Sequence, residues 1–83
     1  MKVTIKSPNP HPAAFMAAEY LEKIEWDLLM VFHGLLAPAA AAGDPIGKRL
    51  HDSLCALLEE KPLEEQDVFG LAWFLREQES QLG

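Results

Sequence analysis

The residues PAAFMAAEYLEKIEWDLLMVFHGLL, positions 12–36, carry the strongest periodic pattern in the chain. Apolar side chains recur in it at alternating steps of four and three, the spacing that places them along one side of a helix. The spacing predicts a single helix over residues 12–36, about 36 Å long at 1.5 Å per residue. The side chains of this seam are Ala17, Leu21, Ile24, Leu28, Val31 and Leu35.

Two shorter helical patterns follow, over about residues 45–60 and 63–81. Asp44 is a favourable N-cap for the first of them, and the proline that follows suits a first helical position. Pro62 separates the two helices, because the residue before a proline disfavours helical backbone. Gly70 lowers helix propensity, which predicts a close helix–helix approach there.

The N-terminal segment has a different character. Residues 1–6 alternate between apolar and polar side chains, a strand pattern of period two, and residues 7–12 (SPNPHP) form an extended proline-rich linker. We expect no second strand within the chain, so this segment is an ordered arm, half of an intermolecular strand pair, or a frayed end. The sequence therefore predicts an all-α fold: a three-helix antiparallel bundle (residues 13–83) with a long first helix, preceded by a short extended N-terminal arm (residues 1–12).

Length and composition exclude several classes of protein. The chain has 83 residues, a formal charge of -6 and one cysteine. These values indicate one small domain, disfavour direct nucleic-acid binding, and exclude an intramolecular disulfide framework. The longest stretch without a formal charge, residues 28–43, is too short for a spanning helix, and prolines stand where a secretory signal would be apolar. We expect no membrane segment and a cytoplasmic location.

The predicted first helix suggests a contact with another protein. It is longer than either partner helix, and its segment LLMVF (residues 28–32) is apolar on every side, so part of it lacks cover within one chain. Trp26, between two acids, is a candidate anchor. The leading hypothesis is a self-associating interaction module, regulatory or adaptor in kind and not an enzyme, which binds a protein partner or forms a homodimer. The predicted interface consists of Trp26, Leu28, Val31, Phe32 and Leu35.

Acidic residues support a second hypothesis. Residues 13–43 carry a net charge of -3 and residues 62–83 carry -4. Such charges usually form a solvated surface, yet they also fit an inhibitor of the mobile-element type that mimics nucleic acid and blocks the protein that binds it. The predicted acidic face consists of Glu19, Glu22, Glu64, Glu65 and Asp67.

The residues capable of chemistry are few. His51 and Cys55 lie four apart and so share one face of a helix, but two ligands do not close a metal site, and His11 and His33 are distant in sequence. Cys55 in mid-helix also lacks the surroundings that activate a thiol nucleophile. The residues GDPIGK (43–48) lack the full spacing of a phosphate-binding loop. We therefore expect no catalytic residues, no metal and no cofactor.

Overall fold

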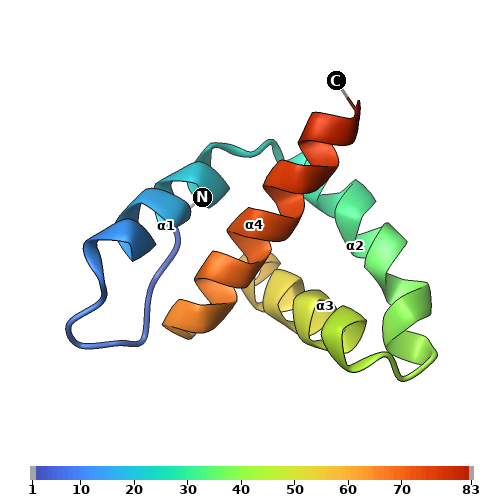
Figure 1. Cartoon of the computed structure of the whole chain (residues 1–83), viewed down its shortest axis with the longest axis horizontal. Helices are drawn as coiled ribbons and strands as arrows, with labels where there is room; N and C mark the ends of the chain where they lie inside the picture. Colours follow the sequence, from blue (N-terminus) through green and yellow to red (C-terminus); the bar gives the residue numbers. More distant parts are fainter. Residues whose placement is uncertain (1, 83) are drawn as a thin grey trace.

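Residues 2–82, the part of the chain that the computed structural model describes, contain four helices instead of the predicted three. Met1 and Gly83, the outer ends of the predicted segments 1–12 and 13–83, lie outside the described residues. The all-α class is confirmed, whereas the three-helix bundle with a long first helix is wrong (Figure 1). The helices are α1 (Pro12–Lys23), α2 (Trp26–Ala41), α3 (Pro45–Leu58) and α4 (Glu65–Leu82).

The predicted long helix breaks at Ile24 and Glu25, whose backbones are extended with ψ of 135° and 143°. The chain bends by 101° between α1 and α2. Lys23 in the last turn of α1 and Asp27 in the first turn of α2 each favour a helix end at these positions.

The bend also changes which side chains are buried. The buried residues of α2 lie one position later than the predicted seam, so Val31 and Leu35 face outward. Those buried in the two helices are Ala14, Ala18 and Leu21 in α1, and Leu29, Phe32 and Leu36 in α2.

A tight turn joins α2 to α3. Gly43 adopts a left-handed backbone with φ of 85°, and the Asp44 carboxylate accepts a hydrogen bond from the backbone N–H of Ile46 at 3.2 Å, as a helix cap does. The predicted Asp44 cap is therefore confirmed. Close helix–helix approach occurs at Gly47, where a Cβ would lie 2.7 Å from the Cβ of Ala39 in α2. The prediction of close approach at Gly70 is wrong, because among the described residues no atom beyond its own local backbone would lie within 4 Å of a Cβ there.

Helix α3 ends in a Schellman motif. Glu60 takes the left-handed conformation with φ of 58°, and the N–H of Lys61 donates to the carbonyl of Ala56 at 2.8 Å. The N–H of Glu60 donates to Leu57 at 3.1 Å. These bonds end α3 two residues before the predicted position and turn the chain toward Leu63.

The N-terminal arm pairs within the chain. Ile5 forms an isolated parallel bridge with Leu63: the N–H of Lys6 donates to the Leu63 carbonyl, and the N–H of Leu63 donates to the Thr4 carbonyl, both at 2.8 Å. The expectation of no intrachain strand partner is thus wrong, because Leu63 precedes α4 instead of belonging to a helix. Val3 and Ile5 pack against the core.

Helix α4 organises the core. It runs between α1 on one side and α2 with α3 on the other (Figure 1), and it packs on both α1 and α3. Phe32 of α2 is fully buried, and its ring meets Phe74 of α4 edge to face at a centroid distance of 6.4 Å. Within residues 2–82, no single helix is long and apolar enough to cross a membrane; α1 and α2 reach that length and hydropathy only together, across their bend.

Candidate functional site

Each of the five residues of the predicted acidic face makes a polar contact within the chain. Three of them form ion pairs: Glu19 with Lys23 at 3.1 Å, Glu64 with Lys6 at 3.7 Å, and Asp67 with Arg49 at 2.8 Å. The Asp67 pair joins α3 to α4, and the bond to this carboxylate raises the pKa of Arg49. These contacts make the acids part of the scaffold.

The other two acids hold the N-terminal arm. Glu22 of α1 accepts a hydrogen bond from the N–H of Val3 at 2.8 Å, and Glu65 of α4 accepts one from the N–H of His11 at 3.1 Å. The arm is thus fastened by one acid from each of two helices in addition to its pairing with Leu63. Segment 2–11 therefore has an assigned place in the fold.

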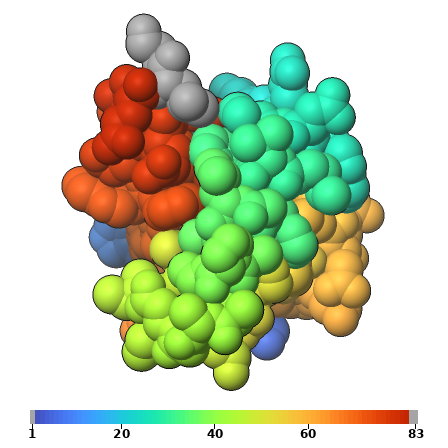
Figure 2. Space-filling model, turned by 90° about the vertical axis from the view of Figure 1, so that its right-hand side faces the viewer, coloured from blue at the N-terminus to red at the C-terminus, as the bar shows by residue number. Residues whose placement is uncertain are grey.

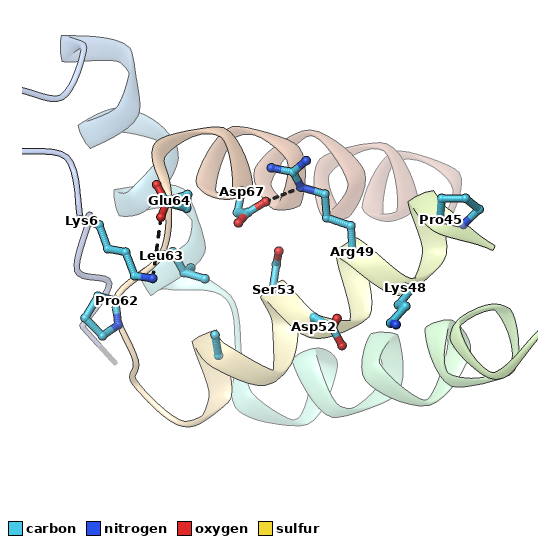
Figure 3. A pocket seen from close by; sticks show the side chains of 11 residues that line it. Lys6, Pro45, Lys48, Arg49, Asp52, Ser53, Pro62, Leu63, Glu64 and Asp67 are labelled. Carbon is cyan, nitrogen blue, oxygen red and sulfur yellow. Dashed lines mark hydrogen bonds and ion pairs between the residues drawn. The ribbon is translucent and has the colours of Figure 1, made fainter. Parts of the chain in front are cut away.

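A pocket of about 450 Å³ lies where α3, the start of α4 and the arm meet (Figure 3). Opposite charges line it: Lys6 pairs with Glu64, which precedes α4, and Arg49 pairs with Asp67 in the first turn of α4. Because this pairing leaves little excess of either sign, the pocket does not have the character of an anion or cation site. Its charged lining residues are Lys6, Lys48, Arg49, Asp52, Glu64 and Asp67.

The outer face of α2 is apolar and exposed. Val31 is 54% exposed and Leu35 is 62% exposed, while Trp26 and Met30 are 51% and 48% exposed. Within α2 only Asp27 carries a formal charge. Figure 2 shows α2, in green, lying across the middle of this side of the molecule. We call these four side chains, Trp26, Met30, Val31 and Leu35, the α2 outer face.

The structure divides the five predicted interface residues. Trp26, Val31 and Leu35 belong to the α2 outer face. Leu28 is half-buried and packs against the core, whereas Phe32 is fully buried. A place for Phe32 in a partner interface is therefore wrong, because this side chain fills the centre of the chain's own core. Met30 was missed, although it lies within the apolar LLMVF segment.

A second apolar groove, of about 380 Å³, lies between α1 and α4 beside Met16 and Trp73. Tyr20 lines it with a buried hydroxyl that makes no hydrogen bond to the described residues. Burial is the main cause that raises the pKa of Tyr20 to about 12, and the Glu79 carboxylate, which interacts with the hydroxyl without meeting the geometry of a hydrogen bond, adds to this rise. An unpaired buried hydroxyl is a local loss of stability and gives no sign of a catalytic role.

Three side chains capable of metal binding meet between α2 and α3. His51 and Cys55 lie on one face of α3, and His33 of α2 faces them. The Cys55 Sγ lies 3.2 Å from the His33 Nε2 and 3.9 Å from the His51 Nδ1, and the two imidazole rings are 4.5 Å apart between centroids. The sequence pattern identified His51 and Cys55; it missed His33 because the α2–α3 turn, not sequence spacing, brings this residue close.

The surroundings of Cys55 disfavour a free thiolate. Burial, together with the carboxylates of Asp52 and Glu59, raises the pKa of this thiol above its ordinary value. A thiol nucleophile requires the opposite change, a lowered pKa next to positive charge. The geometry therefore resembles a ligand set more than a nucleophile with its base.

Comparisons with protein-family models, with curated proteins and with solved structures find no match to this chain.

Proposed function

We propose that this chain is a small helical protein-interaction module without catalytic activity, which self-associates through the α2 outer face. The observation that carries the proposal is the exposure of four large apolar side chains on α2: Met30 and Val31 face away from the core, and Trp26 and Leu35 lie at the two edges of this face. Large exposed apolar side chains mark sites of protein association, and Trp is enriched among binding anchors.

The basis for self-association differs from the one that the sequence offered. An over-long first helix no longer supports it, because α1 and α2 are separate helices. The support comes instead from the exposure of the Val31 and Leu35 side chains in α2, the helix that begins after the break at Ile24. A second copy of α2 laid against this face would cover side chains that the chain itself leaves in water.

The charge-mimicking inhibitor receives less support. All five of its proposed acids contact groups of the same chain, so a partner would compete with existing ion pairs and arm contacts. The exposed ion pairs, worth about 0–1 kcal/mol each, oppose a basic partner only weakly, but a partner that took Glu22 and Glu65 would also release the N-terminal arm. We therefore retain association through α2 as the better-supported function.

Charge substitution on α2 tests the proposal. The side chains of Val31 and Leu35 are more than half exposed. The Val31→Glu and Leu35→Glu variants should therefore each stay folded as a monomer. At a buried interface an unpaired carboxylate would weaken association by at least about 3 kcal/mol, or roughly 100-fold in Kd. Ile46→Glu in α3, at 72% exposure, is the matched control and should leave association unchanged.

Sedimentation equilibrium measures the outcome, and circular dichroism checks helicity. We expect the parent and Ile46→Glu proteins to self-associate, and both α2 variants to be helical monomers. If the parent is a monomer throughout the micromolar range, or if the α2 variants associate as strongly as the parent, self-association through this face is wrong.

A further inference from the structure

His33, His51 and Cys55 converge from two helices on one point between α2 and α3. We propose that these three side chains bind a Zn²⁺ ion that links α2 to α3, with the fourth coordination position open to water or to a group from a bound partner. This site is separate from the α2 outer face, and its tests use different residues.

The distances suit tetrahedral zinc. Zn–S bonds of about 2.3 Å and Zn–N bonds of about 2.0–2.1 Å at tetrahedral angles place the sulfur about 3.6 Å from each nitrogen. The observed separations of Cys55 Sγ from the two imidazole nitrogens, 3.2 and 3.9 Å, lie on either side of that value. All three ligand atoms lie within 4.8 Å of one another, so small side-chain rotations complete the geometry.

Two rigid helices position the ligands. His51 and Cys55 are one turn apart on α3, and His33 comes from α2, the helix with the most extensive packing against α3. The short turn around Gly43 and the contact of Gly47 with Ala39 hold α2 against α3 without the metal. A preorganised ligand set of this kind binds an ion with less ordering of the chain.

A carboxylate lies beside the site. The Asp52 Oδ1 is 3.7 Å from the His51 Nδ1. A negative charge at this position stabilises a Zn²⁺–thiolate unit, whose remaining charge is positive. The thiol proton leaves to the solvent when the Zn–S bond forms. Imidazole and thiolate donors select zinc over Mg²⁺ or Ca²⁺, which prefer oxygen.

The competing interpretation is a simple contact between a thiol and two imidazoles. It accounts for the 3.2 Å distance but predicts no metal affinity. Direct titration with Zn²⁺ separates the two, since a site of three protein ligands binds one ion per chain whereas scattered surface groups bind weakly and without defined stoichiometry.

Four variants make the titration specific. Cys55→Ser, His33→Gln and His51→Gln each remove one ligand. His11→Asn is the matched control: His11 is the remaining histidine of three, lies on the exposed arm, and caps α1 through a side-chain acceptor that Asn retains. Circular dichroism confirms that each variant is folded before metal is added.

We expect the parent and His11→Asn proteins to bind one Zn²⁺ per chain, and each ligand variant to bind at least 100-fold more weakly. Zn²⁺ at 100-fold excess over the parent Kd should raise the parent Tm by roughly 10–20 °C and the Tm of Cys55→Ser by at most about 3 °C. Co²⁺, as a spectroscopic substitute, should give a thiolate charge-transfer band and tetrahedral d–d bands. Zn²⁺ affinity that is unaffected in Cys55→Ser, or Co²⁺ that stays octahedral without a thiolate band, would overturn the proposal.

Discussion

Gly47→Ala offers a sharp test of the packing between α2 and α3. The added methyl group would meet the Cβ of Ala39 at 2.7 Å and the Asp44 Oδ2 at 3.3 Å. The first contact is with an atom fixed to the backbone of α2, so a rotamer change of Ala39 cannot relieve it. The helices must move apart, or the Asp44 cap must shift.

The expected magnitude follows from two opposing effects. Overpacking of this kind costs about 1–3 kcal/mol, and replacing a helical glycine by alanine gains at most about 1 kcal/mol. Because the 2.7 Å contact is with an atom fixed to the backbone, the cost of overpacking is expected in the upper part of its range, about 2–3 kcal/mol. The net result is a loss of about 1–2 kcal/mol in the free energy of unfolding, which lowers Tm by roughly 5–15 °C in a domain of this size.

Two other helical glycines serve as controls. Beyond the local backbone of its own helix, a Cβ at Gly34 or at Gly70 would meet no atom of the described residues within 4 Å, so alanine at either position should raise stability by about 0.5–1 kcal/mol. Substituting Ala39→Gly in the Gly47→Ala protein restores the space, so the double variant should be more stable than the sum of the two single effects predicts.

Thermal and urea unfolding, followed by far-ultraviolet circular dichroism, measure all of these changes. The reasoning requires opposite signs at Gly47 and at the two control glycines. A Gly47→Ala protein that is as stable as Gly70→Ala, with no coupling to Ala39→Gly, would refute the close approach of α2 and α3.

Three further predictions follow from local features. Glu60→Gly should stabilise the chain by about 0.5–1 kcal/mol in urea unfolding, because Glu60 holds a left-handed backbone that favours glycine; a loss of stability would contradict this. Tyr20→Phe should leave the free energy of unfolding unchanged or raise it by up to about 1 kcal/mol, since it removes a buried hydroxyl without a hydrogen bond. A variant less stable than the parent by more than about 1 kcal/mol would reveal a partner for the hydroxyl. Tyr20 is the one tyrosine of the chain, so ultraviolet titration reports it alone: its pKa should be about 12 in the folded protein and about 10 when unfolded. Because the folded state holds this proton more tightly, the associated stability is complete below pH of about 10 and is lost as the pH rises to about 12, and Tyr20→Phe should remove that loss; a native tyrosine that titrates at about 10 would contradict the prediction.

Local chemistry in the sequence determined the helical class and several helix boundaries. Asp44 followed by Pro45 predicts a helix start, and the structure places the cap and the first helical residue at these positions. Such signals succeed because a cap depends on atoms only two or three residues away. The same locality explains why the break at Ile24 and Glu25 was missed, since neither residue is a glycine or a proline and the apolar period continues across it.

For the candidate sites, the sequence identifies some of the residues, and only the structure shows which of them lie together or face outward. The sequence places Val31 and Leu35 in the apolar seam and Trp26 beside it, but only the tertiary structure shows that all three are exposed while Phe32 is buried. His33 could not be joined to His51 and Cys55 from spacing, because the α2–α3 turn brings the two helix faces together.

What the sequence by itself determined is therefore the all-α class, the Asp44 cap, the end of α3 near Pro62 and the identity of the apolar residues on α2. The tertiary structure decided the fourth helix, the pairing of the arm with Leu63, the internal use of the acids and the His–His–Cys cluster. The physical reason is the distance along the chain over which each interaction acts. Capping and periodicity act within a few residues, whereas the bend, the arm and the cluster depend on contacts between segments that are distant along the chain.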